Sequence, residues 1–209
     1  MTMEAFNLAN FKGGQTNPKG SDGKYPERAT PGGYLCTVTG LKNSSEIEGY
    51  TSSPFIEFYL LTEDGKQANA RFWVVKQTDK DSTKEWKKKQ LKDFLMNCGV
   101  TEFNSDAEAC KSAVNRRVQV ALVSEEYVGK DKETGTLVKR TAVKYLWSSK
   151  IGKKLTYNSK YNKVLSADDQ QLLDGMDALK SKFDTEPVAP KSFTRPAAAT
   201  LPEDTDLPF

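Results

Sequence analysis

The sequence predicts a mainly β fold with helices, in which five short strands form a small β-barrel. Three observations favour it: five segments alternate apolar and polar residues, one amphipathic helix separates the third strand from the fourth, and Gly-containing turns join two strand pairs. The 209 residues allow one domain of about 100 to 150 residues with extensions, or two small domains. We expect an irregular arm (1–33), a barrel domain (34–165), an amphipathic helix (166–184) and a flexible linker with an acidic tail (185–209).

The five expected strands are rich in β-branched and aromatic residues. The second strand has apolar residues on its core face, whereas Phe55, Glu57 and Tyr59 fall on the opposite face. The charge of Glu57 predicts that this opposite face is wet. In the third strand Arg71 and Trp73 share one face. The strands are expected at 34–41, 54–62, 70–76, 117–125 and 138–147.

Helix-start patterns predict two amphipathic helices and a short helical turn. A capping box at Ser82 begins the first helix, which ends at Gly99 after an apolar stripe. The same pattern at Ser105 predicts a short turn, and Ser166 caps a second long helix over 166–183. The apolar face of that helix is expected to consist of Leu172, Met176, Leu179 and Phe183.

The resulting order is strand, strand, strand, helix, strand, strand. It is the element order of the five-stranded OB-fold, a barrel that binds oligonucleotides across its second and third strands and the flanking loops. Other five-stranded α+β arrangements share this order, so it does not define the fold alone. The chain shows no internal repeat and no Walker or Rossmann glycine pattern.

The composition excludes several classes of site. With no histidine, Ser-His-Asp and Cys-His catalysis and imidazole-based zinc sites are ruled out. Cys36, Cys98 and Cys110 are widely spaced and form no CxxC, which favours apolar fillers in a reducing compartment over a disulfide framework. We therefore expect neither enzyme activity, nor a cofactor, nor a metal. No signal-peptide pattern or long apolar run is present, so a cytoplasmic location is expected, in the host cytoplasm if the protein is viral.

Charge is distributed unevenly along the chain. Residues 1–164 carry 27 basic and 19 acidic side chains, whereas residues 165–209 carry 4 and 9. Residues 134–167 hold eight basic residues, no acidic residue and several interleaved aromatics, a mixture typical of single-strand binders. A solvated surface with a solubilising tail is the competing interpretation. The eight basic residues are Lys139, Arg140, Lys144, Lys150, Lys153, Lys154, Lys160 and Lys163.

Aromatic and cationic side chains are the candidate nucleic-acid contacts. Trp73 and Arg71 come first, and Tyr59 and Phe55 on the adjacent strand would continue a stacking platform. Core packing is the alternative for each aromatic residue, and it is favoured for Tyr145 and Trp147 because they share a face with Val143. The complete candidate set is Phe55, Tyr59, Arg71, Trp73, Lys76, Arg140, Lys144, Lys150, Lys153, Lys154 and Tyr157.

The chain ends in TLPEDTDLPF, where three acidic residues precede Leu207, Pro208 and Phe209. This end closely resembles the C-terminal tip of bacterial single-stranded DNA-binding proteins, and phage-encoded members of that family have a related acidic, Phe-terminated tail. The resemblance covers only this tip and the order of the barrel elements. It implies an OB-fold that holds the DNA strand. It also implies that the tip recruits replication and repair proteins through Asp204, Asp206, Leu207, Pro208 and Phe209.

Two features depart from the bacterial family pattern. Bacterial members usually have a longer Gly- or Gln-rich linker, and the helix at 166–183 is not part of their simple barrel. The chain therefore looks more like a bacteriophage-encoded member. The family's oligomeric state is not transferred to it, and a homo-oligomer stays an open alternative to a monomer.

The expected function is sequence-nonspecific single-stranded DNA binding in replication, recombination or repair, with no membrane association. A recombination mediator or strand-annealing protein shares the same basic surface and stays an alternative. A metal-dependent nuclease is a weaker alternative, because it needs clustered carboxylates and the acidic residues of the body are scattered. A duplex or RNA binder is a minor option, since no recognition helix or RNA-binding signature is present.

Overall fold

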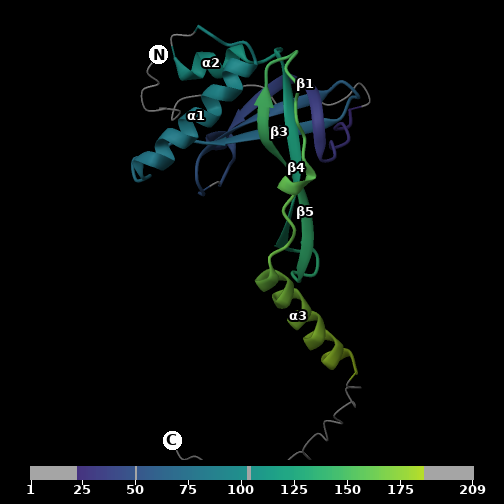
Figure 1. Cartoon of the computed structure of the whole chain (residues 1–209). Coiled ribbons are helices and arrows are strands. Elements are labelled where there is room, and N and C mark those ends of the chain that lie inside the picture. Colours follow the sequence, from purple (N-terminus) through teal and green to yellow (C-terminus); the bar gives the residue numbers. More distant parts are fainter. Residues whose placement is uncertain (1–22, 50, 103–104, 186–209) are drawn as a thin grey trace, which may run out of the picture.

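The computed structural model describes residues 23–49, 51–102 and 105–185, including side chains up to residue 177. Its centre is a five-stranded antiparallel sheet, accompanied in the described part of the chain by three α-helices (Figure 1). The strands are β1 (Gly32–Asn43), β2 (Phe55–Thr62), β3 (Gln67–Trp73), β4 (Arg117–Lys130) and β5 (Leu137–Ser149). The helices are α1 (Asp81–Asn97), α2 (Asp106–Ser112) and α3 (Ala167–Thr185), with 3-10 turns at Ser44–Glu46 and Ser159–Tyr161.

The strand order in the sheet is β3-β2-β1-β4-β5. β1 is the shared strand: residues 32–37 pair with β4 and residues 36–43 pair with β2, with a register shift between Val38 and Gly40. The two edge strands, β3 and β5, lie against each other, and the rings of Phe72 and Tyr145 are 5.2 Å apart. The sheet therefore curls until its edges meet through side chains.

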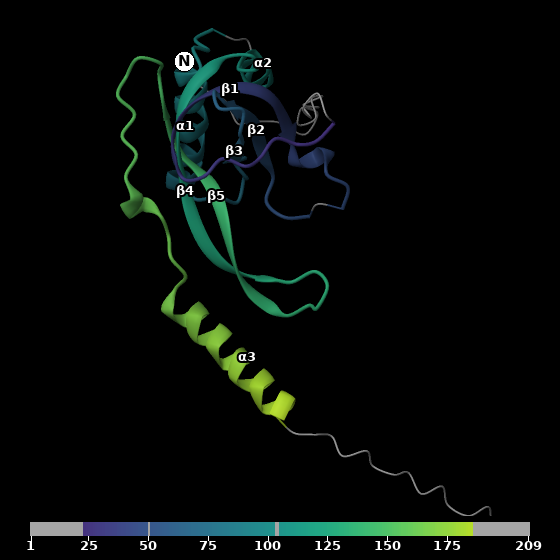
Figure 2. The ribbon, with the colours of Figure 1, turned by 90° about the vertical axis from the view of Figure 1, so that its right-hand side faces the viewer.

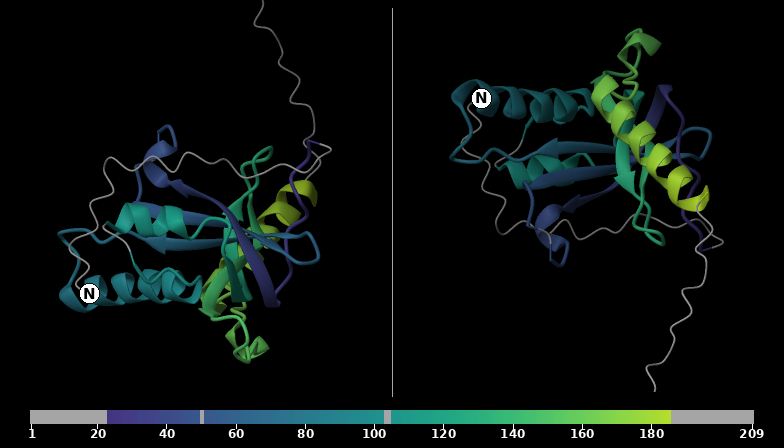
Figure 3. Two further views of the ribbon diagram at one scale, coloured as in Figure 1. Left: turned by 90° about the horizontal axis from the view of Figure 1, so that it is seen from above. Right: turned by 90° about the horizontal axis from the view of Figure 1, so that it is seen from below.

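The core fills the inside of this curled sheet. Phe58, Phe72 and their alternate neighbours on β2 and β3 point inward, as the alternation predicts. α1 covers one end of the core with Phe94, whose ring centroid lies 4.8 Å from that of Phe58 and 5.0 Å from that of Phe72. Each such fully buried side chain contributes about 1.5 to 3 kcal/mol to stability, so this aromatic cluster holds α1 between the edge strands. α1 and α2 both follow β3 and lie beside the same part of the sheet (Figure 3).

The helix starts agree with two of the three expected caps. The Ser105 hydroxyl accepts a hydrogen bond from the Glu108 N–H at 3.2 Å, and Ser166 caps α3 in the same way. The expected cap at Ser82 is wrong, since α1 begins at Asp81 after Lys80 and has no side-chain cap. The preceding turn is fixed instead by Asp79, whose carboxylate accepts hydrogen bonds from the Lys76 N–H at 2.8 Å and the Lys87 ammonium at 2.7 Å.

β4 and β5 extend further than the sequence pattern suggests. Their ladder continues to the pair Lys130 and Leu137, so the hairpin projects beyond the body of the molecule (Figure 2). α3 contacts these two strands and extends away from the sheet (Figure 1). The expected apolar face of α3 is wrong at Leu172, which is 49% exposed, because the neighbouring Leu173 is the buried residue. Leu179 and Phe183 lie outside the described side chains.

The segment after β5 returns along the outside of β1 and β4. A Cβ on Gly33 would lie 2.9 Å from Leu155 Cδ2, so the segment packs directly on the β1 backbone there. Further along, the Lys163 N–H donates to the Ser124 carbonyl at 2.9 Å. Because the returning segment covers the outer face of β4, Ala121 and Val123 on that face are buried. Within the described ranges, no helix has the length and apolar character needed to cross a membrane.

Candidate functional site

The residues that the sequence predicts to form a stacking platform lie together on the outer face of β2 and β3. Phe55 is directly opposite Trp73 in the β2–β3 ladder, and Glu57 is directly opposite Arg71. Because alternate residues share a face, these four side chains and Tyr59 project from the same side of the sheet. The prediction that Arg71 and Trp73 share a face with Phe55 and Tyr59 is confirmed.

Arg71 is held in a fixed orientation on this face. Its Nε and Nη2 atoms donate to Glu57 Oε1 at 3.1 and 2.8 Å, and the guanidinium carbon lies 4.0 Å from the centre of the Phe55 ring. Trp73 packs edge-on against the same Phe55 ring, with ring centroids 5.8 Å apart and an interplanar angle of 81°. The guanidinium plane and the indole are therefore pre-oriented before any ligand arrives.

The expectation that this face is wet is wrong for its middle. Phe55 is 1% exposed and Glu57 9%, and Tyr59 is buried too, whereas Trp73 is 39% exposed. One reason is that Arg71 lies over both the Phe55 ring and the Glu57 carboxylate. Burial, and then the nearby Glu57 charge, raise the pKa of the Tyr59 hydroxyl. The accessible part of the platform thus consists of Arg71 and Trp73, supported from below by Phe55.

The basic run of residues 134–167 is partly neutralised by β4. Lys139 pairs with Glu126 at 2.8 Å, and Lys144 and Lys163 both pair with Glu125. The sequence pattern misses this, because the acidic residues precede the run in sequence. The hairpin register brings them across from Lys139 and Lys144, and the returning segment brings Lys163 beside Glu125. Lys139, Lys144 and Lys163 therefore carry less free charge than their spacing suggests.

The remaining lysines of the run cluster in the segment after β5. Lys150, Lys153, Lys154 and Lys160 are exposed and form no ion pair with the described residues. With its amide nitrogen turned toward this segment, Gln119 on β4 donates to the Lys153 and Lys150 carbonyls at 2.7 and 3.0 Å. The backbone is thus tied to the sheet while the ammonium groups stay in solvent.

Two further candidates, Tyr157 and Lys76, form hydrogen bonds that hold local structure. Tyr157 is half-buried, with its hydroxyl 3.3 Å from the Asn162 amide nitrogen, so it braces the returning segment. Lys76 donates its backbone N–H to Asp79, in the turn before α1. Neither residue lies on the β2–β3 face.

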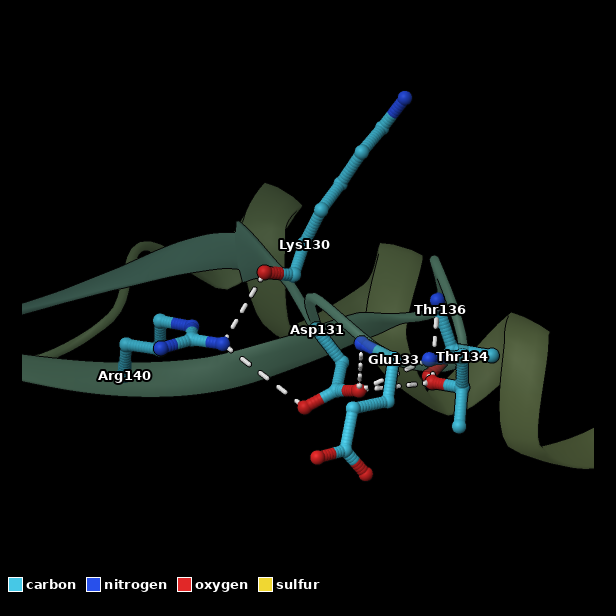
Figure 4. Close-up of polar contacts among 6 residues, drawn as sticks. All are labelled: Lys130, Asp131, Glu133, Thr134, Thr136 and Arg140. Atoms are coloured by element: carbon cyan, nitrogen blue, oxygen red, sulfur yellow. Dashed lines mark hydrogen bonds and ion pairs between the residues drawn. The ribbon is translucent and has the colours of Figure 1, made fainter.

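The tip of the β4–β5 hairpin is a closed turn built on Asp131 (Figure 4). Its Oδ1 atom accepts hydrogen bonds from the backbone N–H groups of Glu133 and Thr134, each at 3.0 Å, and from the Thr134 hydroxyl at 3.1 Å. The Thr134 and Glu133 N–H groups hold the pKa of the Asp131 carboxyl below its usual value. The loop between β4 and β5 is therefore ordered by its own polar contacts.

Arg140, a candidate phosphate contact, is engaged in this turn. Its Nη2 atom donates to the Lys130 carbonyl at 3.0 Å and lies 3.8 Å from Asp131 Oδ2 (Figure 4). The side chain crosses Gly129, where an added Cβ would lie 2.7 Å from Arg140 Cδ. Arg140 therefore stabilises the hairpin tip and presents only part of its charge to solvent.

The sequence predicts that Tyr145 and Trp147 both lie in the core, and the structure separates them. Tyr145 contacts Phe72 and Phe94, and burial raises the pKa of its hydroxyl. The prediction is wrong for Trp147, which packs against Tyr161 with ring centroids 5.1 Å apart. A register shift opposite Ala121 and Leu122 explains the difference, because it skips one residue of β5 and moves Trp147 to the other face.

The other sequence expectations concern cysteines, acidic clusters and the tail. Cys36, Cys98 and Cys110 are buried free thiols, as expected of apolar fillers. Within the described ranges, no group of three or more Cys, Asp or Glu side chains is placed to hold a metal ion. The expected partner contact at Asp204, Asp206, Leu207, Pro208 and Phe209 lies outside the described residues. Comparison of the chain with protein-family models and with curated proteins gives no match.

Proposed function

We propose that this chain is a sequence-nonspecific single-stranded DNA-binding protein built on an OB-fold, acting in replication, recombination or repair. The observation that carries the proposal is the exposed pair Arg71 and Trp73 on the outer face of β2 and β3. In OB-folds this face, together with the β1–β2 and β4–β5 loops, receives oligonucleotides. The strand order, the contact of β3 with β5 and the helices between β3 and β4 support the same fold.

The chemistry of these side chains suits an unpaired strand. The Trp73 indole and the Arg71 guanidinium offer flat surfaces on which bases stack, and every base has such a surface. Lys150, Lys153 and Lys154 can neutralise phosphates, which carry no sequence information. The acidic tip would then be free to recruit a replication or repair protein, as its resemblance to single-stranded DNA-binding proteins implies.

The test is binding of a thirty-nucleotide single strand and of the matching duplex, followed by tryptophan fluorescence. We expect the single strand to bind more tightly and to quench the fluorescence. Trp73→Ala should weaken binding about 10- to 100-fold, the loss expected for one stacked base. Trp73→Phe keeps an aromatic ring and should retain most of the affinity.

Trp86→Ala is the matched control, since Trp86 is 52% exposed on α1 and lies outside the β2–β3 face. It should bind the single strand like the unmodified protein. Equal affinity for single strand and duplex would contradict the proposal. Equal affinity of the Trp73→Ala and Trp86→Ala variants would exclude the β2–β3 face as the binding surface.

A further inference from the structure

A groove of about 360 Å³ lies between α1 and the end of β5, and it shares no lining residue with the β2–β3 face. α1 contributes Gln90, Asp93, Met96 and Asn97, and the other wall includes Trp147 and Lys150. Small-molecule sites span about 300 to 1,000 Å³, so a groove of this size suits one nucleobase rather than a longer stretch of strand.

The walls of the groove are held by hydrogen bonds and ring packing. Asn97 Nδ2 donates to both the carbonyl and the hydroxyl of Ser148 at 3.0 Å, and the Tyr145 hydroxyl donates to the same Ser148 hydroxyl at 3.1 Å. Trp147 is braced by the edge-on ring of Tyr161 at an interplanar angle of 89°. The spacing between α1 and β5 is therefore fixed without a ligand.

Three polar groups in the lining have no partner among the described residues. The Asp93 carboxylate and the Gln90 amide form neither a hydrogen bond nor an ion pair there, and the Lys150 ammonium is also unpaired. A carboxylate accepts hydrogen bonds from exocyclic amino groups such as cytosine N4. Thymine instead presents two carbonyl oxygens beside its single ring N–H, and a carboxylate repels these oxygens.

We infer that this groove binds one base of the bound strand and selects bases that carry an exocyclic amino group over thymine. Asp93 accepts the amino hydrogen, Trp147 and Met96 contact the flat base, and Lys150 neutralises the adjoining phosphate. The inference rests on the proposed single-strand binding and adds a base preference that stacking alone does not give.

The experiment compares thirty-nucleotide oligo(dC) and oligo(dT), two pyrimidine strands, by fluorescence anisotropy with the full-length chain at one salt concentration. We expect oligo(dC) to bind about tenfold more tightly, the effect of one hydrogen bond to a charged group. Asp93→Ala should bring the ratio of the two affinities close to one. Because Asp93 is exposed, this variant keeps the fold.

Glu85→Ala is the control, because Glu85 is an exposed carboxylate on α1 outside the groove. It removes the same charge, so it should raise both affinities and leave their ratio at the value of the unmodified protein. A ratio near one in the unmodified protein, or a ratio unchanged by Asp93→Ala, would overturn the inference and leave the proposed function standing. Binding of neither strand would overturn both.

Discussion

Glu57 is the residue that decides how much charge the β2–β3 face presents. Its nearly buried carboxylate accepts both hydrogen bonds from Arg71, so the Nε and Nη2 edge of the guanidinium, which is the edge suited to a phosphate, is already occupied. Replacing it with glutamine keeps the shape and removes the charge, so Glu57→Gln should increase single-strand affinity several-fold. It should also lower the free energy of unfolding by about 1 to 3 kcal/mol, because the glutamine oxygen still accepts hydrogen bonds from Arg71 but lacks the negative charge that strengthens them. Oligonucleotide titration and urea unfolding measure the two effects.

The control for this change is Glu63→Gln, which removes the carboxylate that pairs with Arg117 at an exposed position. It loses the same charge in a different environment. If it increased the affinity as much as Glu57→Gln, the effect would come from net charge and not from the release of Arg71.

The burial of the three cysteine thiols predicts their reactivity at pH 8. Burial raises the pKa of Cys36 and Cys98 to about 12, and burial raises that of Cys110 as well. At pH 8 the folded protein should therefore leave all three unreactive to Ellman's reagent, whereas the urea-unfolded chain should react at all three. Rapid modification of the folded protein would show that the thiols are accessible and contradict the packing described above.

The same burial sets the direction of a pH effect on stability. In the unfolded chain thiols ionise near their ordinary pKa of about 8.5, while in the folded protein they keep their protons. The free energy of unfolding should therefore fall as the pH rises from about 9 toward 12. Urea midpoints at pH 8 and pH 10 measure this fall, and Cys98→Ala should remove its share of it.

At the scale of single residues, alternation predicts which face a side chain occupies but not what covers it. The shared face of Arg71 and Trp73 is predicted correctly because strand periodicity is local. The burial of Glu57 depends on a cross-strand partner, and the neutralisation of Lys144 depends on Glu125 in another strand. Such pairings depend on how neighbouring strands align, and the spacing of residues within one strand does not predict that register.

Among the elements, the two candidate helix starts at Ser82 and Ser105 give opposite predictions. Ser105 caps α2 through the Glu108 N–H, so Ser105→Ala should lower the free energy of unfolding by about 0.5 to 2 kcal/mol. Ser82 lies inside α1 and caps nothing, so Ser82→Ala should leave stability nearly unchanged. Urea unfolding of the two variants makes the comparison. A larger loss of stability from Ser82→Ala than from Ser105→Ala would support the capping box that the sequence predicts at Ser82.

The elements themselves were largely predictable, and their ends and packing were not. The order of the five strands and α1 follow from periodicity, the short α2 follows from its cap, and α3 follows from both. The extension of β4 and β5 to Lys130 and Leu137 follows from the turn at Asp131, which keeps the hairpin paired in solvent. The shift that moves Trp147 out of the core is a bulge, and a bulge interrupts the alternation from which a prediction is made.

For the whole molecule, the proposed function depends less on net charge than on which lysines are not already paired with a carboxylate. Apart from Arg140, which lies in the hairpin turn, the run of eight basic residues divides into lysines that pair with β4 carboxylates and exposed lysines that form no ion pair with the described residues. Each phosphate neutralised in a single strand contributes about −0.7 to the slope of log affinity against log salt. The two groups of lysines should therefore contribute unequally to that slope.

Two triple variants with the same change in net charge test this division. Lys150→Gln, Lys153→Gln and Lys154→Gln together should make the salt slope shallower by about 2, since three free phosphate contacts are lost. Lys139→Gln, Lys144→Gln and Lys163→Gln together should change it less, because Glu125 and Glu126 already neutralise much of that charge. Titration with a thirty-nucleotide single strand between 50 and 400 mM salt gives both slopes. Equal slopes for the two variants would mean that the strand responds to the overall field of the protein, and that Lys150, Lys153 and Lys154 do not contact its phosphates.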